Sequence, residues 1–457
     1  MRDEVEGRPL LSLFVGLAVG LVAVSSPIAM VILAAWIFWI RPLPARLLAA
    51  SALLLGLGIA PESPHLIETG GMIHAIASVA SVPKPTREGS VFQAKFSGRL
   101  IQVNLTGPVT LSLGDEIQLD GIEHPFPGTM ERYASSLGLE GTLRTDRIKV
   151  IRPGTWIAQM SGRWRRSFLD FTSSSMDPSS AAMVDAVSFN SRDMLEKSTQ
   201  DDLRQSGLIH IVTASGLQVF VLTWMLTALF RFFPVRREAQ LFLIACLIGF
   251  YALASGLSPA IVRASFMSIL GLSAYLVKRE PDALSALALA GVGYLIWDPH
   301  SIYSLGFQLS YVTIGCVSLF YHPDLADKER RSSNFVRLAK NWLLLSGVIL
   351  MATSPLIAYT FGSVSLVAII ANLLVGWCLP FLIASAFLSY FTSWLFPSMG
   401  KEMASHICEP ITNWIQSVLH LTGGTSLSVS FPAFSPYWLV LFYGCWLLTI
   451  RRRIAQP

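Results

Sequence analysis

The chain has 457 residues, of which 53% are hydrophobic and only 14% are charged, and its mean hydropathy is +0.55. Soluble globular proteins carry about 25% charged residues, so this composition excludes an ordinary soluble globule and indicates a membrane protein. At about 20 apolar residues per crossing, the apolar segments provide for about ten to twelve transmembrane helices, which excludes a single-anchor receptor or a secreted enzyme. The net charge of +5 is compatible with a nucleic-acid partner, but in a polytopic protein it more often reflects cytoplasmic anchoring charge.

Twelve apolar runs follow one another along the chain. They cover residues 10–24, 27–40, 47–60, 208–230, 239–255, 260–277, 283–297, 305–321, 342–361, 366–379, 380–396 and 436–450. Several runs are shorter than the roughly 17 residues needed to cross a membrane, so we expect some of them to be re-entrant or tilted in pairs. Residues 10–40 form either one long helix kinked at Pro27 or a short hairpin.

Positive charge is concentrated beside the apolar runs. Residues 61–207 hold 15 Lys and Arg against 17 Asp and Glu, whereas 17 of the 19 Lys and Arg elsewhere form six clusters. Twelve spans place all six clusters on one side, which the positive-inside rule makes cytoplasmic. We therefore expect both termini inside the cell and residues 61–207 outside. The two exceptions are Lys401, in an outer segment, and Arg263, within an apolar run.

Six segments make up the predicted organisation. In chain order, they are N-terminal transmembrane helices (1–60), an extracytoplasmic OB-like β domain (61–154), amphipathic interfacial helices (155–207), a transmembrane channel core (208–396), an extracytoplasmic amphipathic segment (397–435), and a last span with a basic cytoplasmic tail (436–457).

The β domain is predicted from alternation. Between residues 89 and 150, apolar and polar residues alternate with a period of two, as in residues 91–96, and Gly114 with Asp115 marks a turn. About five strands in about 60 residues predict an OB-like barrel, a fold that often binds single-stranded nucleic acid. The aromatic side chains either stack on bases or, as we favour, pack the core; they are Phe92, Phe96, Phe126 and Tyr133.

The next segment predicts a helix at the outer membrane surface. Apolar, aromatic and basic residues recur there at helical spacing and predict an amphipathic helix with a basic face. That face either guides DNA by charge and stacking or extends its arginines to lipid phosphates, and we favour the lipid alternative. The residues that form it are Arg163, Trp164, Arg165 and Arg166, and Trp156, Met160 and Phe168 share the helical spacing.

Three polar or glycine-rich segments interrupt the apolar runs of the predicted channel core. Polar groups are costly in hydrocarbon, so such positions default to contacts inside a helix bundle or to function. Each residue alone is explained by interhelical hydrogen bonding, whereas together they outline a polar core. They are His210, Thr213, Ser215, Gly216 and Gln218; Ser255, Gly256, Pro259 and Arg263; and Gly306, Gln308 and Ser310.

Arg263 lies about one turn inside its run, away from a predicted cytoplasmic end. Burying an arginine in the bilayer costs a few kcal/mol even on lenient insertion scales, so this side chain requires a partner. A passing phosphate, Asp298 and the carbonyl end of a helix are the candidates.

The sequence contains no catalytic or cofactor motif. It has no phosphate-binding glycine loop, no nucleophile elbow and no histidine-rich metal run, and the eight histidines are dispersed. The five cysteines lie far apart, without the spacing of a zinc site. We therefore expect a non-enzymatic protein without a metal or a cofactor, which cannot itself couple ATP hydrolysis to movement.

The order of these motifs resembles the ComEC-type DNA-uptake channel family of naturally competent bacteria. The likeness covers about residues 10–450 and implies an inner-membrane channel that carries single-stranded DNA into the cytoplasm during transformation. It rests on DDLRQSGLIHIVTASGLQVF (201–220), YALASGLSPAIVRASFM (251–267), DALSALALAGVGYLIWDPHSIYSLGFQLSY (282–311) and SPLIAYTFGSVSLVAIIANLL (354–374), with HPFPGTMERYASSLGLEGTLR (124–144) upstream.

The resemblance also assigns residues and partners. It implies that Asn372 caps or cross-links a broken helix, and that the conducting path is lined or shaped by His210, Ser215, Gly216, Gln218, Ser255, Gly256, Pro259, Arg263, Gly306, Gln308 and Ser310. The implied partners are single-stranded DNA, membrane lipids, a DNA receptor, a cytoplasmic ATP-driven translocase and a separate nuclease; oligomerisation is left open.

Two departures from the family pattern matter. Gln218 stands where the family usually has His, which argues against a proton or metal role at this position. The chain also resembles a short member without the metallo-β-lactamase-like domain of longer relatives. The alternative is therefore a polytopic envelope protein that transports or senses a lipid or another polyanion and has lost DNA uptake.

Overall fold

The computed structural model describes residues 13–15, 17–18, 52, 55, 72–86, 89–97, 99–107, 109–126, 138–191, 194–212, 216–276, 283–320, 335–423, 428–432, 435, 438–439 and 441–443. The chain divides into two compact units. One comprises Ser63–Glu280 and Leu374–Ser426, and the other comprises Met1–Glu62, Pro281–Leu373 and Leu427–Pro457. The spans predicted before residue 61 and after residue 435 lie almost entirely outside the described residues.

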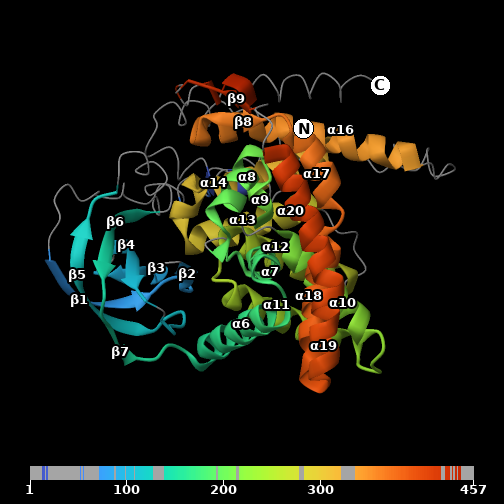
Figure 1. Ribbon diagram of the computed structural model, residues 1–457. Coiled ribbons are helices and arrows are strands. Elements are labelled where there is room, and N and C mark those ends of the chain that lie inside the picture. The colour runs from blue at the N-terminus through green and yellow to red at the C-terminus, as the bar shows by residue number, and fades with distance from the viewer. Residues whose placement is uncertain are drawn as a thin grey trace. The chain divides into compact units, whose positions relative to one another are not determined.

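A closed five-stranded barrel opens the first unit (Figure 1). Its strands are β1 (Met72–Val79), β3 (Gly89–Phe96), β4 (Arg99–Thr106), β5 (Glu116–His124) and β6 (Leu139–Thr145), while β2 (Lys84–Thr86) pairs with β3 and β7 (Ile148–Arg152) pairs with β5. The order β1-β3-β4-β6-β5 closes because β5 also pairs with β1. Strands β4 and β6 run parallel, and the other pairs are antiparallel. The predicted OB-like barrel is therefore confirmed.

The alternation of apolar residues builds the barrel core. In β3, Phe92 and Ala94 are buried, whereas Lys95 is exposed. Phe92 is 2% exposed and lies in a core with Ile101, Val103 and residues of the other strands. Burying a large apolar side chain contributes about 1.5–3 kcal/mol, so this core is the main source of barrel stability.

The described aromatic residues of the β domain pack in its interior and are not available to stack on nucleic-acid bases. Phe92 belongs to the main core, Phe126 is 8% exposed in a small cluster with Leu139, and Phe96 packs partly against the main core. Core packing is thus confirmed for these three residues. Tyr133 lies outside the described residues.

Asp115 ties the barrel to the helix that follows it. Its carboxylate accepts hydrogen bonds from the backbone N–H of Ser112 and of Gly154, both at 2.7 Å. A Cβ at Gly154 would lie 2.6 Å from the carbonyl oxygen of Leu113, so only glycine allows this close approach. Asp115 itself is 5% exposed. The connection from β7 to the next helix is therefore held by charge-assisted hydrogen bonds rather than by a loose linker.

The same unit continues as helices. They are α6 (Trp156–Ser175), α7 (Pro178–Phe189), α8 (Lys197–Gln205), α9 (Ile209–Val212), α10 (Gly216–Phe230), α11 (Arg237–Ala254), α12 (Pro259–Leu276), α18 (Leu379–Leu395), α19 (Pro397–Met403) and α20 (Glu409–Gly423). A π-helical turn, Ala404–Cys408, joins α19 to α20. The segment predicted to be amphipathic, residues 397–435, is thus helical as far as Gly423, with Ile415 and Leu419 on its buried side.

Aromatic rings from four helices form the core next to α6. Phe168 of α6 lies with its ring centroid 5.1 Å from that of Phe189 in α7, and 5.3 Å from those of Phe387 and Tyr390 in α18. Trp164 of α6 contacts the same cluster and also reaches α11. Edge-to-face pairs at these separations contribute beyond simple burial. Helix α6 is therefore part of a packed helical core.

This packing corrects the prediction for the basic face of α6. Arg165 is only 4% exposed, because it lies on the buried face of the helix with Phe168. Trp164 is occupied by its aromatic neighbours. Arg163 is exposed and Arg166 is half-buried. The four residues thus do not form one exposed DNA-guiding surface, since the helix turns two of them inward.

The second unit contains the remaining described elements. They are α13 (Ala283–Trp297), the 3₁₀ helix Pro299–Tyr303, α14 (Leu305–Phe320), α16 (Phe335–Phe361), β8 (Ser363–Ser365), the first part of α17 (Ala368–Gly376) and β9 (Ser428–Ser430), which pairs with β8.

Two helices in the described part of the chain are long and apolar enough to cross a membrane, Arg237–Ala254 and Ala368–Leu395. The second combines the runs predicted separately at 366–379 and 380–396. Five shorter apolar helices coincide with other predicted runs. The larger number of spans, and the side on which each terminus lies, remain predictions.

Candidate functional site

The C-terminal turn of α7 accepts hydrogen bonds from polar side chains of two other helices. Tyr251 of α11 donates its hydroxyl to the carbonyl oxygen of Ser188 at 2.5 Å, and the amide of Gln218 in α10 donates to the carbonyl oxygen of Val187. The last carbonyl groups of a helix have no partner within it, so these side chains satisfy them inside the core. Gln218 is fully buried. The Gln at this position therefore acts as a hydrogen-bond donor between helices.

Two buried ionisable side chains, one basic and one acidic, lie beside this turn. Arg165 of α6 and Asp185 of α7 are 4% and 3% exposed. Arg165 donates to the hydroxyl of Ser191 at 2.9 Å, and Asp185 accepts from the hydroxyl of Thr172 at 2.8 Å. Burial raises the pKa of the Asp185 carboxyl to about 8, and burial lowers the pKa of the Arg165 guanidinium to about 10. The sequence did not point to Asp185, because α7 is short and apolar all round, so its pattern does not show which of its residues face the core.

Two consecutive residues with positive φ mark the break between α11 and α12. Gly256 has a φ of +82°, and Leu257 follows with a φ of +52° before α12 begins at Pro259. A left-handed leucine costs free energy and persists only where the surroundings impose it. Arg263, one turn into α12, is 4% exposed, and Ser255 before the break is 6% exposed. The predicted polar interruption is therefore a real, buried discontinuity between two helices.

Helices α10 and α12 approach closely at Gly216. A Cβ on Gly216 would lie 3.2 Å from the Cβ of Ala264, tighter than ordinary van der Waals contact. This close approach places the start of α10 beside the residue that follows Arg263. His210 in α9 is exposed, with its Nδ1 at 3.2 Å from the carbonyl oxygen of Gly207. Thr213 and Ser215 lie outside the described residues.

The third motif belongs to the second unit. Asp298 accepts a short hydrogen bond from Ser301, and the amide of Gln308 donates to the carbonyl oxygen of Ile302 at 3.0 Å. These bonds hold the 3₁₀ turn against the start of α14, which contains Gly306 and Ser310. Asn372 of α17 is half-buried in the same unit. The predicted path residues thus form two groups, one in each unit, and their assembly into one path remains a prediction.

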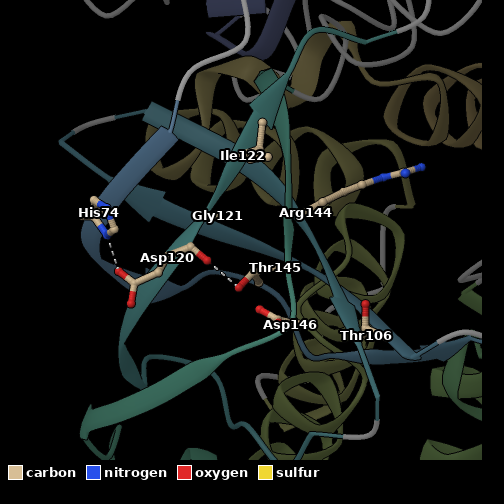
Figure 2. Close-up of a pocket in the computed structure, with 8 residues that line it drawn as sticks. All are labelled: His74, Thr106, Asp120, Gly121, Ile122, Arg144, Thr145 and Asp146. Atoms are coloured by element: carbon tan, nitrogen blue, oxygen red, sulfur yellow. Dashed lines mark hydrogen bonds and ion pairs between the residues drawn. The ribbon is translucent and has the colours of Figure 1, made fainter.

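The barrel carries a surface hollow of about 410 Å³, shown in Figure 2. His74 Nδ1 lies 2.8 Å from Asp120 Oδ1, and the hydroxyl of Thr145 donates to the carbonyl oxygen of Asp120 at 2.7 Å. The residues that line the hollow are His74, Thr106, Asp120, Gly121, Ile122, Arg144, Thr145 and Asp146. One arginine and one histidine face two aspartates, so the hollow does not concentrate positive charge as a phosphate backbone requires. The described residues contain no group of three His, Cys, Asp or Glu suited to a metal.

The middle of the outer face of β3, β4 and β6 is rich in amides, while Lys95, Glu140 and Arg144 add charge around it. Gln93 pairs with Gln102 across the strands, and Gln102 donates to Asn104, which donates to Thr142, each at 3.3 Å. The aromatic side chains described in this domain are buried or partly buried instead. Hydrogen bonding is therefore the chemistry that this face offers, without an aromatic stacking platform.

Comparison with known proteins gives a family and distant relatives. The chain is 25% identical over 210 residues to ComE operon protein 3 of Bacillus subtilis, and 28% identical over 259 residues to Recombination protein 2 of Haemophilus influenzae. These matches cover 46% and 54% of the chain but only 26% and 32% of the relatives. The chain thus spans about a quarter to a third of the length of these curated relatives. No solved structure matches. The model of the competence protein family matches residues 187–455, more than half of the chain, so the chain belongs to the competence protein family.

Proposed function

We propose that this protein acts in DNA uptake and that its helices form a membrane channel for single-stranded DNA. The observation that carries the proposal is the buried polar discontinuity between α11 and α12, with Arg263 one turn beyond it, within the segment that matches the competence family. The match to the competence protein family and the name of one relative, Recombination protein 2, agree with it.

The physical requirements of such a channel match these residues. Single-stranded DNA carries one negative charge per nucleotide, so a passage needs some positive charge to admit it. It also needs sites weak enough to release each phosphate, which a lone arginine among hydroxyl and amide groups provides. A protein without its own nucleotide-binding motif must be driven by others. We therefore propose a DNA receptor, a cytoplasmic ATP-driven translocase and a separate nuclease as partners.

The test is substitution of Arg263 in the full-length protein. We expect Arg263→Ala to leave the amount of protein in the membrane fraction unchanged and to reduce transformation by added DNA to the level of a gene deletion. Arg263→Lys, which keeps the charge, should retain part of the activity. Arg204→Ala is the matched control, because Arg204 is exposed and pairs only with nearby Asp201 in α8. Normal transformation by Arg263→Ala at normal membrane levels would contradict the proposed role.

A second candidate is an envelope protein that handles a lipid or another polyanion. The specific observation in its favour is the outer face of the barrel, which offers amides rather than aromatic rings. A strain lacking the gene separates the two functions. Normal transformation in that strain favours the second candidate, whereas loss of transformation favours DNA uptake.

A further inference from the structure

Residues 148–163, which we call the β7–α6 elbow, expose large apolar side chains at one end of the barrel. Trp156 is 71% exposed, and Met160 is 49% exposed one turn later. Between 39% and 48% of the surface is exposed at Val150, Ile151 and Ile157. Strand β7 lies at an edge of the described sheet, where it pairs with β5, and its residues from Lys149 to Arg152 are exposed. Several large apolar side chains exposed in one short segment mark an interaction site.

The charge of the elbow has a single sign. Residues 147–166 contain six Lys and Arg and no Asp or Glu. Lys149, Arg152 and Arg163 are exposed. Trp156, Met160 and Arg163 follow one another at i, i+4 and i+7, so they share one face of α6. The opposite face, with Phe168, packs into the aromatic core. One end of α6 therefore combines a packed inner face with an outer face that is apolar and basic.

The elbow is rigid before any partner binds. The backbone N–H of Gly154 is held by Asp115, and Thr155 caps α6 with its side-chain oxygen 3.4 Å from the backbone nitrogen of Ala158. The amide of Gln159 donates to the carbonyl oxygen of Gly154 at 3.3 Å. Because these bonds fix the turn, a partner would not have to order it, which lowers the entropic cost of association.

Helix α6 also packs beside one end of a candidate membrane span. The ring of Trp164 lies 5.6 Å from that of Phe250 and 6.4 Å from that of Tyr251, which are near the C-terminal end of Arg237–Ala254. A spanning helix meets the lipid headgroups at its end. The position of α6 therefore brings the elbow close to the depth at which Trp and basic side chains are enriched in membrane proteins.

We propose that the β7–α6 elbow docks on the surface of a bilayer that contains anionic phospholipid. Trp156, Ile157 and Met160 enter the boundary between headgroups and acyl chains, and Lys149, Arg152 and Arg163 bind lipid phosphates. Single-stranded DNA shares the phosphate but fits less well, because bases stack on aromatic rings and four of the five exposed apolar side chains are aliphatic. The inference rests on the proposed membrane-spanning helices and not on transport of DNA.

The test uses the full chain in nanodiscs of phosphatidylglycerol and phosphatidylethanolamine. A photoreactive benzophenone amino acid replaces Trp156 in one variant, Met160 in a second, and Lys95 in a control. Lys95 is exposed on β3 of the same barrel. After irradiation, mass spectrometry measures the lipid adducts. We expect roughly tenfold more adduct at positions 156 and 160 than at position 95.

A second set of samples tests the charges and the competing partner. Replacing Lys149, Arg152 and Arg163 by Gln should lower the adduct yield in anionic nanodiscs and change it little in phosphatidylcholine nanodiscs. A single-stranded oligonucleotide is added in parallel. Oligonucleotide adducts at position 156 that displace lipid adducts, or equal lipid adducts at positions 156 and 95, would overturn the proposal. Failure of DNA transport in cells would leave the lipid adducts unchanged, so the two proposals are tested separately.

Discussion

The barrel and the helices that follow it bury charge in different ways. In the barrel, buried Glu123 is held by Arg99, whose side chain keeps 33% of its surface exposed, and the main core is apolar. In the helices, Arg165 and Asp185 are both buried within the core. Burying an ionisable group costs free energy that an apolar residue of the same shape would not cost. The main core of the barrel is thus apolar, whereas the helical core includes a buried arginine and a buried aspartate.

The largest test of this difference concerns the aromatic core. Phe168→Ala removes a ring that is fully buried among three others and should lower the free energy of unfolding by about 3–5 kcal/mol. Ile101→Val, in the barrel core, should cost only about 0.5–1.5 kcal/mol. Denaturant unfolding of the purified full chain, followed separately by probes in each region, measures both. Equal losses would show that the two cores do not differ as described.

The second test is the pH dependence of the helical core. The pKa of Asp185 is about 8 in the folded protein, above its ordinary unfolded value, so the folded state binds the extra proton. Stability contributed by this group is present at low pH and falls as the pH rises from about 4 to about 8, by up to about 1.4 kcal/mol per pH unit. The charged group nearest to Asp185 is Arg165, which in turn lies near Arg166 and the neutral hydroxyl of Tyr251.

Melting temperatures between pH 5 and pH 8 measure this dependence. Asp185→Asn, which cannot titrate, should flatten the slope, while Asp170→Asn on the exposed side of the same helix pair should leave it unchanged. An unchanged slope in Asp185→Asn would mean that another group carries the pH dependence.

The most local test concerns the junction between the two regions. Asp115→Ala removes two charge-assisted hydrogen bonds to backbone N–H groups, each worth about 1.5–3 kcal/mol, although water can reach part of the site and reduce the loss. We expect faster hydrogen exchange at Ser112 and Gly154, with the barrel core unaffected. Asp146→Ala, at an exposed turn of the same domain, is the control. Protection that persists at Gly154 would show that packing alone holds the junction.

Local patterns predicted the barrel well, and they also marked the interruption at which α11 and α12 separate. Alternation in β3 and β4 identifies the strands, because each side chain alternates between core and surface. Gly256 and Pro259 mark the break between α11 and α12, because neither residue continues a helix easily. The family motifs were also readable, since their order survives in the chain.

Contacts between distant segments could not be read in this way. The sequence of α6 predicts a helix with an aromatic and basic stripe. That stripe alone does not show which side of the helix packs against other helices. The partners that bury Arg165 and Trp164 come from α7, α11 and α18, up to more than 200 residues later. Asp185 likewise has no sequence signal, because its role depends on Thr172 and Arg165 in another helix.

The π-helical turn Ala404–Cys408 has a consequence for how this part of the chain tolerates change. A turn with i to i+5 bonds holds one residue more than an α-helical turn, so it shifts the phase of everything that follows by about 100°. The buried side of α20, with Ile415 and Leu419, is in phase with its neighbours only because of that extra residue. Deleting one residue here would leave a more regular helix and rotate its apolar stripe away from the protein. At this turn the helix gives up its regular hydrogen-bonding pattern, and in exchange the apolar side of α20 packs against the rest of the protein.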